Sequence, residues 1–192
     1  ILRYREHTLT DKEEKLLAAS GEMSRAARDG FDMLDNADLQ LGEIEDESGE
    51  PLTLTHGNFQ SLMQNYDRRM RKDAFHTYYK AYESHRFTYS TLLSSSVKKD
   101  LFYSRSRNYS GYRAKALFSE NISEEVYDNL IESVHQNLKP LYKYFEIRKK
   151  LLGLDELHAY DCSVPLVKNI KWHMPYEEAV EKIKIALQPL GA

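Results

Sequence analysis

The chain has 192 residues, 30% of which are charged, and its formal net charge is only −3. Because no large field of one sign results, we expect neither generic nucleic-acid binding nor attraction to an anionic membrane. A chain of this length hides roughly 70% of its unfolded surface on folding, so it can build a sizeable core in one or two domains.

Cysteine usage and the two ends of the chain bear on its origin. Cys162 is the single cysteine, so no internal disulfide can form, and the chain suits a reducing, cytoplasmic compartment. No run approaches the ~20 apolar residues of a membrane-spanning helix, and the start lacks the pattern of a signal peptide. The first residue is Ile1 rather than Met, and the chain stops at Ala192 just after an amphipathic pattern. We therefore expect an excised piece of a longer protein.

The first quarter of the sequence predicts a helix followed by a β-hairpin. Thr10 and Glu13 form a capping box, which should begin a helix that runs to Ala27. Gly30 and the polar residues after it are expected to end that helical pattern. Apolar and polar residues then alternate on both sides of a turn, which predicts one hairpin over about 39–55.

A long helix is the main expectation for the middle of the chain. The stretch from Asn58 to Ser110 contains no Gly and no Pro, and its apolar residues recur every three to four positions. A helix from about Asp67 to Tyr109 would be on the order of 60 Å long, whereas a compact protein of this size has a diameter of roughly 40 Å. The helix must therefore kink, protrude or lie along a larger body, and we favour the larger body.

The second half predicts shorter helices separated by breaks. A second capping box, from Asn121 to Glu124, should begin one helix. Pro140 begins the next, which Gly153 ends, and an irregular segment leads to a last helix that begins after Pro175. The complete pattern is that of an all-α, mostly helical protein with one small β-hairpin.

No residue set in the sequence matches a zinc-peptidase centre. Such a centre needs His-Glu-x-x-His on a helix, because histidines four residues apart share one face and the Glu holds the attacking water. None of the seven histidines is followed by Glu or has another histidine four residues away; they are His7, His56, His76, His85, His135, His158 and His173. We therefore predict that this chain contains no catalytic residue and no metal ligand, and the sequence identifies no substrate-binding residue.

Two weaker patterns carry alternative chemistry. Glu132 and His135 have the Glu-x-x-His spacing of di-iron carboxylate bundles, but such a site needs a second copy of the motif, so we favour a solvated helix face. Cys162 has His158 four positions before it, but no local feature would activate the thiol. We expect a quiet buried thiol.

The basic run from Tyr103 to Arg113 interleaves arginines with aromatic residues, as surfaces for single-stranded nucleic acid do. The same run fits a helix end, because Arg105 and Arg107 would complement the negative end of the helix dipole. We favour the helix end. The fourteen tyrosines of the chain need partners for their hydroxyls when buried, which hints at helices around a polar channel.

Several segments spread over nearly the whole chain form a further pattern. In chain order they are Arg5-Glu-His7-Thr-Leu-Thr10 with Glu13-Glu-Lys-Leu-Leu17, Leu52-Thr-Leu54 with Asp67-Arg-Arg-Met-Arg-Lys-Asp-Ala74, Tyr103-Ser-Arg-Ser-Arg-Asn-Tyr-Ser-Gly-Tyr112, Tyr142-Lys-Tyr-Phe-Glu-Ile-Arg-Lys-Lys-Leu-Leu-Gly-Leu154, and Tyr160-Asp161 through Pro165-Leu166. In this order and spacing they resemble oligoendopeptidase F, a bacterial member of the thimet-oligopeptidase-like zinc metallopeptidases.

The resemblance implies a helical, clamshell-like peptidase that hydrolyses short peptides in a deep channel. In the family order, the zinc-binding motif and a downstream Glu lie past Ala192, so no zinc is expected on this chain and the isolated chain should be inactive. Residues 1–66 would be the end of the N-terminal helical domain, with the hairpin at about 39–55. Residues 67–192 would begin the catalytic domain without its zinc site and would supply scaffold and channel wall.

Two alternatives stay open. One is a non-catalytic helical module that binds another protein with its long tyrosine-lined helix. The other, weaker one is a metal-carboxylate protein built around Glu132 and His135. On the peptidase reading, the expected partners are short peptides and the remainder of the catalytic domain, and exposed apolar helix faces should make the isolated chain self-associate.

Overall fold

The structure is a computed structural model that describes residues 2–167 and 174–191. It is mostly helical with one two-stranded antiparallel sheet, which confirms the predicted fold class. In chain order the elements are η1 (Leu2–His7), α1 (Asp11–Ala19), η2 (Met23–Arg25), α2 (Ala26–Met33), the π-helical η3 (Leu34–Asp38), β1 (Glu43–Glu45), β2 (Pro51–Thr53), α3 (His56–Met63), α4 (Arg68–Ser84), α5 (Arg86–Ser106), α6 (Tyr112–Phe118), α7 (Glu124–Gln136), α8 (Leu138–Leu151), η4 (Ala159–Asp161), α9 (Tyr176–Leu187) and η5 (Gln188–Leu190).

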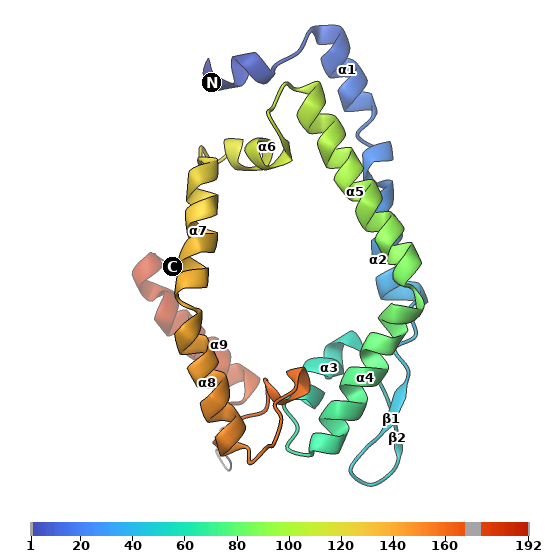
Figure 1. The fold of residues 1–192 in the computed structure, drawn as a ribbon, viewed down its shortest axis with the longest axis vertical. Helices are drawn as coiled ribbons and strands as arrows, with labels where there is room; N and C mark the ends of the chain where they lie inside the picture. Colours follow the sequence, from blue (N-terminus) through green and yellow to red (C-terminus); the bar gives the residue numbers. More distant parts are fainter. Residues whose placement is uncertain (1, 168–173, 192) are drawn as a thin grey trace.

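The helices trace an open hoop (Figure 1). α2 and α5 lie side by side along one side, while α7 and α8 form the other. α6 connects the two sides at one end, and α3, α4 and the hairpin lie at the other end. None of the helices in the described part of the chain is long and apolar enough to cross a membrane.

The N-terminal helix begins as predicted but does not run through to Ala27. The backbone N–H of Thr10 donates to Glu13 Oε2 at 3.0 Å, as in a capping box. The helix ends at Ala19, where the Ser20 hydroxyl donates to the Leu17 carbonyl and competes with the helical pattern. A 3-10 turn follows, and the chain becomes helical again in α2.

The prediction that Gly30 ends the helical pattern is wrong. Gly30 lies inside α2, and the helix continues to Met33 before one π-helical turn. A Cβ at Gly30 would lie 3.2 Å from Leu92 Cδ2 on α5, so the missing side chain permits the close approach of the two helices. The glycine serves helix packing here, not termination.

The predicted hairpin is confirmed, with strands shorter than its 39–55 range. Ile44 pairs with Leu52 in an antiparallel register. Asp46 Oδ1 accepts from the backbone N–H groups of Ser48 at 2.7 Å and Glu50 at 3.0 Å, which holds the turn. The hairpin packs on α4 and shares one core with α3, α4 and η4. The buried members of this core are Leu39, Leu41, Ile44, Leu54, Leu62, Met63, Met70, Ala74 and Tyr160.

The long helix predicted over 67–109 is two helices, α4 and α5, separated at His85. The Ser84 hydroxyl donates to the Ala81 carbonyl at 2.6 Å, and His85 Nδ1 lies 3.1 Å from the same oxygen. The His85 N–H therefore bonds to the Tyr82 carbonyl instead of that of Ala81. Of the three outcomes considered, the structure shows the kink.

The second half follows the predicted helices, but two helix starts are misplaced. α8 begins at Leu138 and not at Pro140, which lies in its first turn, where a missing N–H costs no helical hydrogen bond. The N-cap of α7 is Ser123, two residues after the predicted position, because Asn121 adopts a left-handed conformation at φ +58° and ends the preceding turn. Gly153, at φ +67°, follows the C-terminus of α8 as predicted. Residues 157–167 are irregular apart from η4, and α9 begins after Pro175, also as predicted.

Candidate functional site

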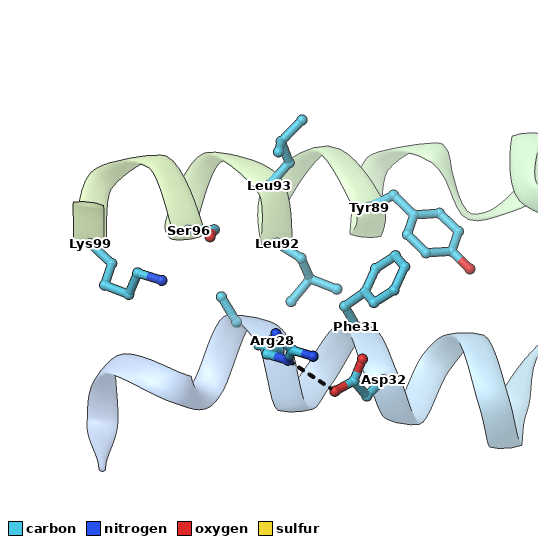
Figure 2. Close-up of a pocket in the computed structure, with 9 residues that line it drawn as sticks. Arg28, Phe31, Asp32, Tyr89, Leu92, Leu93, Ser96 and Lys99 are labelled. Carbon is cyan, nitrogen blue, oxygen red and sulfur yellow. Dashed lines mark ion pairs between the residues drawn. The ribbon is translucent and has the colours of Figure 1, made fainter. Parts of the chain in front are cut away.

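A groove of about 540 Å³ between α2 and α5 is the clearest candidate for a ligand site (Figure 2). Its floor is apolar: Phe31 and Leu92 point toward each other between the two helices, whereas Leu93 points away from α2. On its rim, Arg28 pairs with Asp32 at 3.5 Å. The groove thus offers apolar contact and a neutralised rim, and its lining includes no pair of groups suited to hydrolysis.

Next to the groove, a hydrogen-bonded network surrounds Asp35 on the π-helical turn. The hydroxyls of Tyr82 and Tyr89 donate to Asp35 Oδ1 at 2.8 and 3.3 Å. His56 lies with Nε2 3.0 Å from the Asp35 carbonyl and Nδ1 3.0 Å from the Tyr78 hydroxyl. The hydroxyls of these half-buried tyrosines thus have the partners that the tyrosine-rich sequence required.

Burial and the adjacent carboxylate raise the pKa of Tyr82 and Tyr89 and so keep these two hydroxyls neutral. Burial, together with the charge and hydrogen bond of Asp35, raises the pKa of Tyr89 to about 12. Burial and the hydrogen bonds to Tyr78 and Asp35 raise the pKa of Tyr82 further. Because these three tyrosine hydroxyls are bonded within the chain, they are not free to contact another protein, which disfavours the interaction-module alternative.

The Glu132 and His135 pair does not form a metal site in the described structure. Both residues are exposed on α7, and Glu132 Oε1 accepts from Gln136 Nε2 at 2.7 Å. Within residues 2–167 and 174–191, no three His, Cys, Asp or Glu side chains converge where they could hold a metal ion. His173 lies outside the described residues. The arrangement favours the solvated helix face.

Cys162 is half-buried, not fully buried as predicted. Its Sγ lies 3.5 Å from the His158 carbonyl oxygen, so the thiol contacts the backbone and not the imidazole. The His158 ring instead stacks on Tyr160, with ring centroids 5.0 Å apart. The two residues therefore do not form a nucleophile and base pair.

Two of the three arginines of the basic run, Arg107 and Arg113, are engaged in ion pairs. Arg107 donates through both terminal nitrogens to the carboxylate of Glu14, at 2.7 Å each, and these bonds lower the pKa of Glu14. Arg113 binds Glu124 and Asp128 on α7. The charges of Arg107 and Arg113 are therefore balanced within the chain, and Arg105 lies in the last turn of α5, as the helix-end interpretation expects.

Neither the groove nor the Asp35 network was predicted from the sequence. Both depend on contacts between residues far apart in the chain, such as Asp35 with Tyr89, and on a π-helical turn that no spacing rule reveals. The available signal was the spacing of the tyrosines every three to four residues along one helical stripe. This spacing predicted that the tyrosine rings would be buried, but not which residue their hydroxyls would contact.

The fold and sequence together define the class of this protein. Residues 61–189 match the sequence model of peptidase family M3, and residues 1–40 match that of oligopeptidase F. The chain therefore belongs to peptidase family M3, which confirms the resemblance derived from its segments.

Individual relatives agree with this placement. Oligopeptidase PepF of Bacillus subtilis is 42% identical over 191 residues, which cover 100% of this chain and 28% of that protein. An oligoendopeptidase F homolog of Lactococcus lactis is 40% identical over 96% of this chain and 31% of its own length. A crystal structure of oligoendopeptidase-F from Enterococcus faecium superimposes with a TM-score of 0.86 at 39% identity, covering 100% of this chain and 36% of that one. The chain thus spans about a third of the length of the proteins it is similar to.

Proposed function

We propose that this chain forms scaffold and channel wall of a zinc metallopeptidase that hydrolyses short peptides, and that the catalytic centre lies outside it. The family match over residues 61–189, in a chain whose sequence lacks His-Glu-x-x-His, carries this proposal. Family M3 peptidases are metallopeptidases, but the described residues of this chain do not fit a zinc ion. We therefore derive no step of hydrolysis through them.

We propose that residues 1–66 belong to the N-terminal helical domain and residues 67–192 to the start of the catalytic domain. The separate matches to residues 1–40 and 61–189 support a boundary in this region. The hairpin nevertheless packs on α4, so the two parts share a core and would not move independently at this point.

The surface area supports a partner that covers much of this chain. The accessible surface is 14992 Å². A compact protein of 22.5 kDa exposes only about 9,500 Å². Large apolar side chains are exposed on α7 and α8, among them Val126, Leu130, Ile131, Leu141 and Leu151. We propose that the remainder of the peptidase covers them and that the isolated chain self-associates through them.

For compartment, we propose the cytoplasm, because the chain depends on no disulfide and its Cys162 is a free thiol.

A chimera tests the proposed function. The segment of the Bacillus subtilis relative that aligns with this chain would be replaced by this chain, and cleavage of a quenched fluorescent peptide would be measured with and without chelator. The unmodified relative serves as the positive control, and the isolated chain is assayed in parallel. We expect chelator-sensitive cleavage by the chimera and none by the isolated chain.

Two results would contradict the proposal. A folded chimera that binds one zinc ion but does not cleave would show that this chain cannot furnish the wall. Chelator-sensitive cleavage by the isolated chain would place the catalytic centre within it.

A further inference from the structure

The side of the hoop formed by α7 and α8, called here the limb, has no buried apolar residue of its own. In α7, all of whose residues the structure describes, none is buried, and in α8 the single buried residue is Arg148. α7 packs on α8 at one end and on α6 at the other. α6 is itself held by its Phe118 ring, which contacts the rings of Tyr4, His7 and Tyr109. At the α8 end, a polar contact and not a hydrophobic core must therefore fix the position of the limb.

Arg148 makes a buried polar attachment at the end of the limb. Its side chain is 4% exposed. Nε donates to the Asp161 carbonyl at 2.8 Å, Nη1 to the Tyr144 hydroxyl at 2.9 Å, and Nη2 to the carbonyl of Val164. Three directions of the guanidinium are thus occupied, which ties α8 to the segment around η4 in one orientation.

The same segment is tied to α4 through the Asp161 side chain, which is 0% exposed. Arg68 donates to both carboxylate oxygens, from Nε at 3.0 Å and from Nη2 at 2.9 Å. Arg71 donates from Nη2 to Oδ1 at 2.8 Å and from Nε to the Tyr160 carbonyl at 2.9 Å. Burial opposes the charge, yet the hydrogen bonds from Arg68 and Arg71 hold the pKa of Asp161 at about 2.

We infer that Arg68, Arg71, Arg148 and Asp161 form a latch that closes the hoop and sets the position of the limb relative to α5. The inference rests on the proposed function, under which the limb is part of the channel wall and Arg148 and Asp161 are positioning residues for it. The latch thereby determines how large a peptide the two sides can admit.

A latch of charged groups fixes the position of the limb more strictly than an apolar contact would. Apolar side chains can slide and repack, whereas guanidinium donors have fixed directions. Removing the Asp161 carboxylate leaves Arg71 buried without its counter-charge, and removing Arg148 leaves the carbonyls of Asp161 and Val164 without this donor. Both changes are costly, so the latch has no stable half-made state. Its arrangement is therefore all or none.

Pulsed electron spin resonance between two labels tests the latch in the full chain. Labels on exposed positions of α5 and α7 would be introduced as Ser95→Cys and Ser133→Cys in a Cys162→Ser background. We expect one narrow distance distribution for the parent. Arg148→Met and Asp161→Asn should each broaden this distribution and shift it to longer distances, because each breaks the latch on a different side.

Two controls keep the result interpretable. Arg113→Met removes two exposed ion pairs between α6 and α7, outside the latch, and should leave the distribution unchanged. A second label pair, at Ser48 on the hairpin and Lys80 on α4, reports whether the core stays folded. The inference is overturned if Arg148→Met or Asp161→Asn leaves the α5 to α7 distance unchanged, or if the distance changes only when the core pair also broadens.

The measurement requires no catalysis, so it separates the latch from the assignment of peptidase function. An inactive chimera with an intact latch would contradict the function alone. A limb distance that is insensitive to either substitution would contradict the latch alone.

Discussion

Replacing Ser104 by alanine should stabilise the chain. Ser104 lies near the end of α5 and is 0% exposed, and its hydroxyl has no hydrogen-bond partner among the residues that the structure describes. A buried hydroxyl without a partner costs about 1–3 kcal/mol. Alanine is also a better helix former than serine, by roughly 0.5 kcal/mol.

The size of the effect can be separated into these two parts with a control on the same helix. Ser94 is exposed, so Ser94→Ala reports helix propensity alone and should raise the free energy of unfolding by roughly 0.5 kcal/mol. Ser104→Ala should gain about 1 kcal/mol more than this control, at the lower end of the desolvation range because some packing volume is lost.

Urea unfolding of the three proteins, followed by far-ultraviolet circular dichroism, measures the difference. An increment of about 1 kcal/mol corresponds to roughly 2–4 °C in melting temperature for a chain of this size. If Ser104→Ala gains no more than Ser94→Ala, or destabilises the chain, the hydroxyl has a partner in solution and the reasoning fails.

Four other substitutions have defined outcomes. Gly42→Ala should lower the free energy of unfolding in urea by roughly 2–3 kcal/mol, because Gly42 has φ +86° and a Cβ there would lie 2.8 Å from Thr77 Cγ2. Gly49 has φ +85° with open space around it, so Gly49→Ala should lower the free energy of unfolding by only about 1 kcal/mol. Asp161 has a depressed pKa of about 2, so its contribution to stability is present above pH ~4 and is lost as the pH falls from about 4 to about 2. In urea unfolding at a series of acid pH values, the free energy of unfolding of Asp161→Asn should therefore fall by about 2 kcal/mol less over this range than that of the parent. Tyr89 has a raised pKa of about 12, so its contribution is present below pH ~10 and is lost as the pH rises from about 10 to about 12. An absorbance titration in which Tyr89→Phe fails to remove a late tyrosinate step would contradict this assignment.

Local chemistry accounts for the elements that the sequence predicted. The Thr10 cap, the turn held by Asp46 and the left-handed Gly153 depend on residues within a few positions of one another. Each of these residues satisfies a backbone group or supplies a backbone conformation that its neighbours require. Such caps and turns can be predicted from one sequence because residues far away in the chain do not alter their local hydrogen bonds.

The helix boundaries that were wrongly predicted depend on tertiary packing or on competing local hydrogen bonds, which the sequence alone does not show. Gly30 continues a helix because Leu92 on another helix fills the space above it. His85 ends α4 because its side chain and that of Ser84 contact the same carbonyl, although neither residue is a helix breaker by type. Asn121 ends a turn in a conformation that asparagine tolerates, so it does not cap the next helix.

The candidate sites were even less accessible to sequence reasoning. Periodicity showed that the tyrosine stripe would be buried, but the carboxylate that joins its hydroxyls belongs to Asp35, 47 positions before Tyr82. Arg148 and Asp161 are common residue types on polar stretches, and their burial follows from the shape of the hoop. A motif search cannot find a site whose members are joined only by the completed fold.

Because the latch joins residues 90 positions apart, Arg71 and Asp161, it also bears on the order of folding. Closing a loop of this length costs on the order of 4 kcal/mol of chain entropy before any contact compensates it. The hairpin and its packing on α4 involve much shorter loops and can form first. We therefore expect the hoop to close last, so that substitutions in the latch accelerate unfolding while leaving the rate of early collapse nearly unchanged.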